Sequence, residues 1–153
     1  MKIRSQNVRL ATILLAVTSL SLADEIDDFT SDGCSSFPDG TVAQRELWRS
    51  CCVVHDLAYW QGGTAEQRMA ADKALKVCVT EVGEPTIAEL MLAGVRVGGT
   101  PWIPSQFRWG YGWPYLRGYK QLSEDEVDMV EKKIQAAMEL LEAQQSSSTG
   151  DSQ

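Results

Sequence analysis

Two short segments decide how this chain folds: CCVVHDLAY at residues 51–59 and ADKALKVC at residues 71–78. Neither segment contains Gly or Pro, and each belongs to a longer stretch whose apolar residues recur at helical spacing. The first stretch is free of helix-breaking residues from Thr41, a suitable N-cap, to Trp60. We therefore predict a first helix over residues 41–60.

The second segment belongs to a helix that is predicted to begin after Thr64. Thr64 and Gln67, three residues later, have the form of a capping box. The helix should end before Gly83 and Pro85, because Gly favours other backbone conformations and Pro lacks the amide hydrogen. With only a Gly-containing turn between them, the two helices are expected to form a hairpin.

The first predicted helix carries the only histidine of the chain, His55. His55 lies four residues after Cys51 and four before Tyr59, so these side chains form one stripe, whereas Asp56 is turned about 100° away. A single histidine excludes metal sites that need two imidazole ligands. The helix therefore carries a potential base and a carboxylate on different faces.

A disulfide between the two helices would bring His55 to a second acid, Asp72. If Cys51 bonds to Cys78 across an antiparallel pair, His55 lies about 6 Å from the disulfide along one helix. Asp72 then lies about 9 Å from the disulfide along the other helix, so the two side chains come near each other. In this arrangement the carboxylate of Asp72 can hold the imidazole of His55 in one tautomer. Four cysteines permit three pairings, however, and spacing does not choose among them. Alternatively, Asp72 pairs with Lys76 one helical turn later.

Two further helices complete an all-α prediction. Residues 87–97 form an apolar segment of helical length, although two β-branched valines disfavour a helix there. A capping box at Ser123 and Glu126 predicts a final amphipathic helix. Its apolar stripe consists of Val127, Val130, Ile134, Met138 and Leu141. The Gln- and Ser-rich residues 144–153 are expected to be disordered.

The N-terminal residues 1–23 have the pattern of a secretory signal peptide. Three cations precede the apolar stretch of residues 10–20, and small residues precede a cleavage site after Ala23. The apolar stretch is too short to span a bilayer, which takes about 20 residues. We therefore expect a secreted or periplasmic protein whose four cysteines form disulfides.

The remainder of the chain fits one domain, predicted over residues 24–143. Without the signal peptide it has 11 basic and 21 acidic residues, a net charge of −10. Such an acidic chain lacks the basic face that binding to nucleic acids requires. Nucleic acid is therefore not an expected partner.

The two segments together resemble the signature of secreted phospholipases A2, in particular the shorter microbial or viral forms. Seven residues stand at the spacing of that family: Cys51, Cys52, His55, Asp56, Tyr59, Asp72 and Cys78. The resemblance implies a disulfide-linked antiparallel helix pair preceded by a calcium-binding loop. It implies that His55 is the general base that activates water, oriented by Asp72 and Tyr59, and that Asp56 binds Ca²⁺. The implied reaction is hydrolysis of the sn-2 acyl ester of glycerophospholipids without a covalent acyl-enzyme.

The resemblance also implies loop ligands and a disulfide pattern. Counting back from Asp56, the calcium-binding carbonyls of the family fall on Ser35, Phe37 and Asp39. The N–H of Phe37 would help to stabilise the oxyanion. The loop lacks the Gly-rich run that is usual in animal members of the family. The expected disulfides are Cys51–Cys78 and Cys34–Cys52.

An aromatic segment follows the predicted hairpin. Residues 101–119 contain seven of the twelve aromatic side chains of the chain, among Gly and Pro. One interpretation is a collar that contacts the phospholipid surface through Trp102, Trp109 and Trp113, since Trp favours the headgroup region. The other is a loop packed on the core. The first would make the protein a peripheral membrane enzyme.

Two classes of function remain open. The first is a calcium-dependent phospholipase, which the complete set of His55, Asp56, Tyr59 and Asp72 favours. The second is a catalytically silent, phospholipase-like module that binds lipid or protein, which the altered calcium loop motivates. An activity assay with and without calcium separates them.

Overall fold

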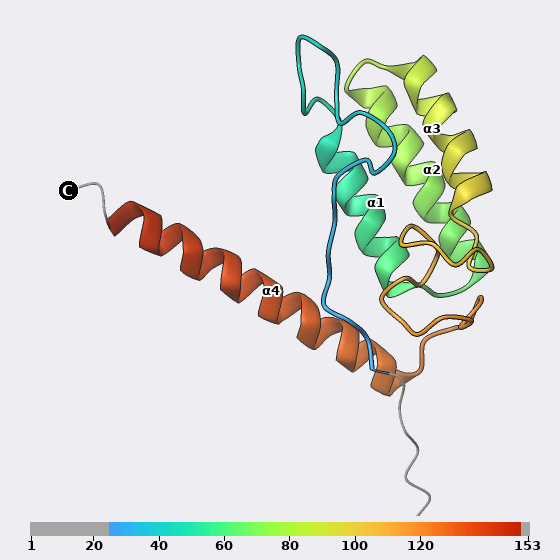
Figure 1. Cartoon of the computed structure of the whole chain (residues 1–153), viewed down its shortest axis with the longest axis vertical. Coiled ribbons are helices and arrows are strands. Elements are labelled where there is room, and N and C mark those ends of the chain that lie inside the picture. The colour runs from blue at the N-terminus through green and yellow to red at the C-terminus, as the bar shows by residue number, and fades with distance from the viewer. Residues whose placement is uncertain (1–24, 151–153) are drawn as a thin grey trace, which may run out of the picture.

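The computed structural model describes residues 25–150, apart from the side chains of residue 141 and residues 143–150. Within this range it contains four α-helices and no β-strand (Figure 1), which confirms the predicted all-α class. The helices are α1 (Arg49–Gln61), α2 (Ala65–Glu81), α3 (Pro85–Gly98) and α4 (Glu124–Gly150). None of these helices combines the length and the hydropathy needed to cross a membrane. The predicted signal peptide lies outside the described residues.

The turn between α1 and α2 depends on two glycines. Gly62 and Gly63 have φ values of 71° and 131°, in the region that favours Gly. α2 then begins with the predicted capping box. Thr64 Oγ1 accepts a hydrogen bond from the Gln67 N–H (3.2 Å), and the Gln67 side chain accepts one from the Thr64 N–H (2.8 Å).

Two disulfides fix the hairpin and the loop before it. Cys51–Cys78 joins the first turn of α1 to the end of α2, so the helices are antiparallel in the expected register. Cys34–Cys52 fastens the preceding loop to α1. Both expected pairings are therefore formed, and all four cysteines are used.

The first helix begins at Arg49, whereas we predicted a start at Thr41. The Thr41 hydroxyl caps a short turn instead. The reason lies at the buried Trp48, whose backbone N–H donates to the Asp39 carbonyl (3.0 Å) and whose indole N–H donates to the Pro38 carbonyl (2.6 Å). These bonds hold the intervening residues against the preceding loop, so the helix starts only after Trp48.

α1, α2 and α3 lie side by side in one layer (Figure 1), in which α2 packs against both neighbours. The buried core of this layer consists of Trp48, Cys51, Cys52, Leu75, Val79, Ala88 and Met91. Pro85 stands in the first turn of α3, where a helix tolerates a missing N–H. The helix expected over residues 87–97 is thus present, and burial of its apolar face against α2 stabilises it.

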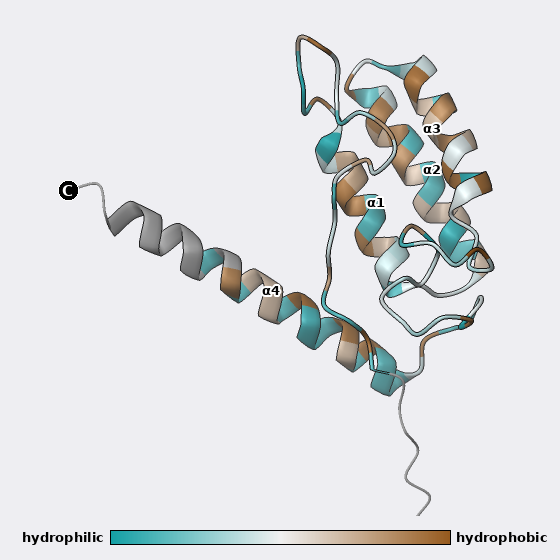
Figure 2. Cartoon of the chain, viewed as in Figure 1, coloured by the Kyte–Doolittle hydropathy of each residue, from teal (hydrophilic) through white to brown (hydrophobic). Residues whose placement is uncertain are grey.

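α4 leaves this layer and projects away from it (Figure 1). It begins with the predicted capping box of Ser123 and Glu126. Hydrophobic and hydrophilic residues alternate along its first half (Figure 2), and Val130 is buried whereas Met138 is exposed. The predicted stripe is therefore buried only near the start of the helix. The buried cluster at this place consists of Ile26, Trp60, Trp113 and Val130.

The end of the chain differs from the prediction of disorder. Residues 144–150 continue α4 as a helix. The side chain of Leu141, the last member of the predicted stripe, and residues 151–153 lie outside the described part.

The aromatic segment packs on the hairpin through two of its three tryptophans. Trp109 and Trp113 are each 1% exposed, and their indole N–H groups donate to the carbonyls of Gly63 (2.9 Å) and Gln61 (2.8 Å). The Gln61 carbonyl ends α1, where carbonyls lack partners within the helix, and the Gly63 carbonyl lies in the turn that follows. The two indoles donate to these carbonyls and so hold the aromatic segment on the hairpin. The interpretation of Trp109 and Trp113 as lipid contacts is therefore wrong. Trp102, in contrast, is 58% exposed.

Candidate active site

His55 of α1 and Asp72 of α2 form a buried, hydrogen-bonded pair. His55 Nε2 lies 2.9 Å from Asp72 Oδ1. Because an ionised carboxylate can only accept, Nε2 is the donor of this bond, and Nδ1 is the ring nitrogen that can act as a base. His55 also lines a cavity. The hairpin thus brings together the two residues that the spacing indicated.

Asp72 is fully buried and accepts three hydrogen bonds. Oδ1 bonds His55 and the Tyr59 hydroxyl (2.7 Å), whereas Oδ2 bonds Arg96 Nη1 (2.6 Å). Burial alone would raise the pKa of Asp72, but the hydrogen bonds from His55, Arg96 and Tyr59 lower it below its ordinary value. Asp72 is therefore an ionised acceptor at neutral pH.

Tyr59 is held as a donor to Asp72 by Arg68. Arg68 Nε donates to the Tyr59 hydroxyl (3.0 Å) and cannot accept from it. Of the two acceptors near the hydroxyl, Asp72 Oδ1 (2.7 Å) is closer than the Val95 carbonyl (3.4 Å), so the Tyr59 hydrogen points to Asp72. Burial, and after it the charge of Asp72, raises the pKa of Tyr59 above its ordinary value. Tyr59 is therefore neutral and orients the carboxylate.

Arg68 and Arg96 are the site residues that the sequence analysis missed. Arg68 stands one helical turn before Asp72, and this i, i+4 spacing was a usable signal. Lys76, the partner considered there, pairs instead with Glu89 of α3 (2.5 Å). Arg96 reaches Asp72 from a different helix, and no local pattern in the sequence indicates this contact.

Asp56 lies next to His55 on α1 but has a separate environment. Its Oδ2 accepts a hydrogen bond of 2.6 Å from Ser31 Oγ. Burial, together with the nearby charges of Asp32 and Asp39, raises the pKa of Asp56 to about 6, although the bond from Ser31 lowers it. A carboxylate whose charge is compensated this poorly is a suitable ligand for a hard cation.

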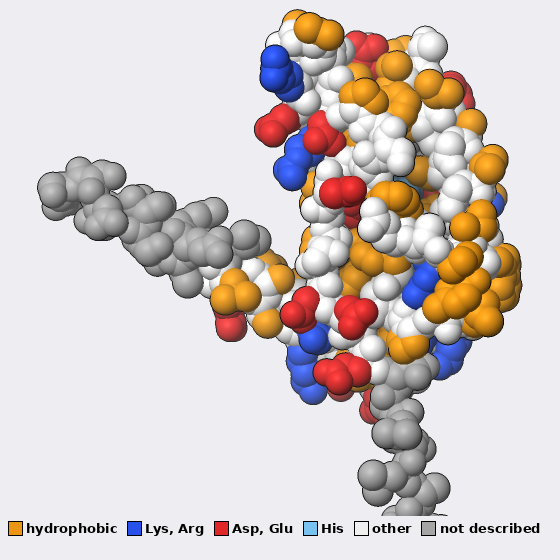
Figure 3. All heavy atoms as spheres, viewed as in Figure 1, with side chains coloured by type: hydrophobic (Ala, Val, Ile, Leu, Met, Phe, Trp, Pro, Cys, Tyr) orange, Lys and Arg blue, Asp and Glu red, His pale blue; other side chains and the backbone are white. Residues whose placement is uncertain are grey.

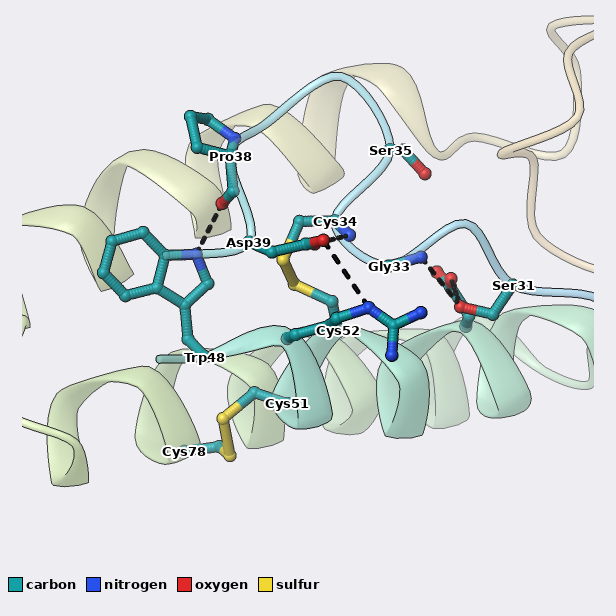
Figure 4. The surroundings of a disulfide bond; sticks show 12 residues. Ser31, Gly33, Cys34, Ser35, Pro38, Asp39, Trp48, Cys51, Cys52 and Cys78 are labelled. Atoms are coloured by element: carbon teal, nitrogen blue, oxygen red, sulfur yellow. Dashed lines mark hydrogen bonds and ion pairs between the residues drawn. A yellow bond between two sulfur atoms is a disulfide. The ribbon is translucent and has the colours of Figure 1, made fainter. Parts of the chain in front are cut away.

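The loop before α1 covers the same region of the helix and is fastened there by the disulfide Cys34–Cys52 (Figure 4). Two of the loop residues that the resemblance indicated, Ser35 and Phe37, line the cavity together with Asp56. Ser35 has a φ of 58°, a left-handed conformation that residues other than Gly seldom adopt. Strain of this kind is concentrated at functional sites.

Two groups of this loop have partners other than those the resemblance implied. The Asp39 carbonyl accepts from the Trp48 N–H (3.0 Å), and the Asp39 carboxylate accepts from the Cys34 N–H (2.7 Å; Figure 4). The Phe37 N–H donates to the Cys34 carbonyl (3.0 Å). Asp39 thus braces the loop, and the Phe37 N–H is occupied. The Phe37 N–H as an oxyanion donor therefore does not fit this geometry, and Asp39, whose carbonyl bonds Trp48, is not among the residues that line the cavity.

The cavity beside His55 has a volume of about 390 Å³ and a mainly apolar lining. The large apolar side chains around it are Leu75, Leu90, Met91, Val95 and Phe107. A second, more polar hollow of about 300 Å³ shares four lining residues with it: Ser35, Asp56, Phe107 and Tyr111. An apolar cavity with a titratable pair in its wall suits a ligand that joins a hydrocarbon part to a polar reacting group.

Comparisons with known proteins do not identify a relative of this chain. Comparison of the chain with protein-family models, with curated proteins and with solved structures found no match. Within residues 25–150, no group of three or more His, Cys, Asp or Glu side chains is placed to hold a metal ion. A cation at Asp56 would therefore need hydroxyl, carbonyl or water ligands as well.

Proposed function

We propose that this protein is a calcium-dependent hydrolase of the phospholipase A2 type, which cleaves the sn-2 acyl ester of glycerophospholipids with water activated by His55. The observation that carries the proposal is the 2.9 Å bond between His55 Nε2 and Asp72 Oδ1 at the wall of an apolar cavity. Asp56, the next residue along α1, borders the same cavity. The resemblance of the CCVVHD segment to secreted phospholipases A2 supplies the reaction type and the substrate class.

His55 is the general base in this proposal. Because Asp72 binds the proton on Nε2, the lone pair on Nδ1 accepts the proton from water. The buried, ionised Asp72 then stabilises the positive charge that develops on the imidazole without taking the proton itself. The hydrogen bond from Tyr59 keeps the carboxylate in place.

A water nucleophile agrees better with the side chains present than a covalent intermediate does. All four cysteines are in disulfides, which excludes a thiolate. Ser31 donates its hydroxyl to Asp56 and not to His55. Direct attack by water on the ester needs no further side chain.

The oxygen groups around Asp56 fit a calcium ion. The Asp56 carboxylate accepts a hydrogen bond from the Ser31 hydroxyl, and burial nevertheless raises the pKa of Asp56 to about 6. Among the loop residues, Ser35 and Phe37 line the cavity together with Asp56, and they are the ones we propose to supply further oxygen ligands. When bound, calcium would act as a Lewis acid that polarises the ester carbonyl and stabilises the oxyanion.

The substrate we propose is a lipid in a membrane or dispersion. Hydrophobic side chains gather over the end of α3 and the adjoining aromatic segment (Figure 3). The exposed large ones on these two elements are Leu90, Val97, Trp102, Ile103, Tyr115 and Leu116. Such a patch supports contact with a lipid surface. Because the net charge without residues 1–23 is −10, we expect faster action on zwitterionic than on anionic lipid.

The two disulfides support a location in an oxidising compartment. The pattern of residues 1–23 supports export to it. We therefore propose that the protein is secreted or periplasmic.

Positional analysis of the products tests this function. The protein is incubated with calcium and a phosphatidylcholine whose two acyl chains differ, and we expect release of the sn-2 fatty acid. His55→Gln should release none. Lipid binding that survives His55→Ala, with neither calcium binding in calorimetry nor fatty-acid release, would instead indicate a catalytically silent binding module.

A further inference from the structure

Arg96 of α3 contacts the carboxylate that orients His55. Arg96 Nη1 donates to Asp72 Oδ2 at 2.6 Å, whereas His55 and Tyr59 both bond to Oδ1. The two oxygens of Asp72 thus have different partners. The terminal torsion of an aspartate is broad and roughly two-fold, so a partner on only one oxygen leaves the group free to rotate. The bond to Oδ2 removes this freedom.

The charge of Asp72 also depends on Arg96. Asp72 is fully buried, and burying an unpaired carboxylate is strongly unfavourable. Two guanidinium groups face Oδ2, with Arg96 Nη1 at 2.6 Å and Arg68 Nε at 3.9 Å. At these distances only Arg96 makes a hydrogen bond with Oδ2. Arg96 is therefore the principal counter-charge of the acid that accepts the His55 proton.

Arg68 in turn fixes the backbone that carries Arg96. Its Nη2 donates to the carbonyls of Val95 (2.7 Å) and Arg96 (3.0 Å), in the last turn of α3. Its Nη1 donates to the Tyr119 hydroxyl (2.8 Å), and the whole side chain is buried. The Val95 carbonyl also accepts the Gly99 N–H (3.0 Å), whereas carbonyls of the last turn such as that of Arg96 commonly lack a partner within the helix. By bonding both, Arg68 ties the end of α3 to α2.

We propose that Arg96 is a positioning residue, whose guanidinium keeps Asp72 ionised and directed at His55 Nε2 and thereby selects the tautomer with a free Nδ1. The kinetic part of this inference rests on the proposed function. The selection of the tautomer does not, because it is a property of the folded protein alone. α3 also lines the cavity through Met91. The same helix therefore contributes to the proposed substrate cavity and, through Arg96 and Asp72, orients His55.

The single histidine makes the tautomer directly measurable. Nitrogen NMR of protein labelled with ¹⁵N-histidine reports which ring nitrogen of His55 carries the proton and how fast that proton exchanges. Arg96→Met removes the guanidinium, and Arg96→Lys keeps a positive charge. Lys76→Met is the matched control, because it removes an ion pair with Glu89 between the same two helices without touching Asp72.

We expect the wild type and Lys76→Met to show one tautomer, protonated on Nε2 and exchanging slowly. Arg96→Met should show mixed tautomers with proton exchange at least about 10-fold faster. For fatty-acid release, kcat should fall by about 10–100-fold in Arg96→Met, the usual effect of losing a group that orients another site residue. KM should change by less than about 2-fold, because no contact with substrate is lost. Arg96→Lys should recover most of both properties.

Wild-type imidazole signals together with wild-type kcat in Arg96→Met would overturn the proposal. If that variant does not fold, Arg96→Gln takes its place, because it keeps a donor but removes the charge; unchanged signals there also overturn the proposal. An inactive wild type whose imidazole signals change with residue 96 would refute the proposed function and support the positioning role. If the wild type is active but substitution of Arg96 changes neither the imidazole signals nor kcat, the proposed function is supported and the positioning role is refuted.

Discussion

Ser31 donates a hydrogen bond of 2.6 Å to the carboxylate of Asp56, 25 residues later in the chain. Within residues 25–150, no Lys or Arg forms an ion pair with this carboxylate. Burial therefore raises the pKa of Asp56 to about 6. An ionised Asp56 destabilises the cation-free fold, and a bound cation would remove that effect.

We expect Asp56→Asn to stabilise the calcium-free protein and to abolish hydrolysis. The amide oxygen can still accept the bond from Ser31, while the partly buried charge is lost. The free energy of unfolding at pH 8 should rise by about 1 kcal/mol, after allowance for solvent screening of the carboxylate. Urea denaturation in excess chelator measures it. Asp28→Asn is the control, because Asp28 is exposed and should change stability little.

The stability that Asp56→Asn gains over the wild type should increase as the pH rises. The folded pKa of Asp56 is about 6 and its ordinary value is 3.8, so the folded state binds this proton more tightly. The wild type should therefore lose stability relative to Asp56→Asn as the pH rises from about 4 to about 7. A stability difference that does not change over this range would contradict the burial of Asp56.

Gly99→Ala should disturb the site, whereas its neighbour Gly98 should tolerate the same change. A Cβ added at Gly99 lies 2.4 Å from Tyr59 Cε1, 2.6 Å from its hydroxyl and 2.8 Å from the Val95 carbonyl, so the Tyr59 ring or the backbone must shift. Nothing lies within 4 Å of a Cβ at Gly98. Thermal unfolding should show a loss of about 1–3 kcal/mol for Gly99→Ala and a gain of about 0.5 kcal/mol for Gly98→Ala. Equal stability of the two variants would argue against this packing.

The ion pairs of Glu126 with Arg117 and Lys120, at the start of α4, should contribute less to stability in acid. Burial alone would raise the pKa of Glu126, but Arg117 and Lys120, each 2.8 Å away, and the Ser123 N–H lower it to about 2. Because this pKa is below the ordinary value of 4.5, the stabilisation is present above about pH 4.5 and is lost as the pH falls towards 2. Unfolding of the wild type and of Glu126→Gln, compared between pH 7 and pH 2, measures it. The difference between them should be largest at pH 7 and should vanish near pH 2; the opposite trend would refute the assignment.

The two disulfides should contribute similarly to stability but differently to calcium binding. They close loops of 18 and 27 residues, so removing either should cost about 3 kcal/mol. Only Cys34–Cys52 fastens the loop that faces Asp56. Calorimetry should show calcium affinity at least about 10-fold lower in Cys34→Ser/Cys52→Ser, and little changed in Cys51→Ser/Cys78→Ser. An equal loss in both double variants would show that the loop does not hold the ion.

Local chemistry explains what could be predicted from the sequence. The capping boxes at Thr64 and Ser123 involve residues three apart, so tertiary structure does not enter. His55 and Asp72 are farther apart in the sequence, but each lies at a known distance along its helix from the disulfide that joins the two helices, so their contact could be predicted. The same regularity placed Asp56 beside the base.

Tertiary contacts explain what could not be predicted. The start of α1 depends on Trp48, whose bonds reach the preceding loop. The burial of Trp109 and Trp113 depends on carbonyls at the end of α1, and aromatic density alone does not reveal such partners. Arg96 of α3 bonds to Asp72 of the neighbouring α2, and the Asp39 carbonyl accepts from Trp48. None of these contacts has a local signature.

The most direct test of water activation by His55 is the initial rate of fatty-acid release from phosphatidylcholine dispersions. It is measured for the wild type with calcium, for the wild type with excess chelator, and for His55→Gln with calcium. We predict release by the first and at least about 1,000-fold slower release by the other two. Equal rates in all three conditions, or no release by the folded wild type with calcium, would contradict the proposed function.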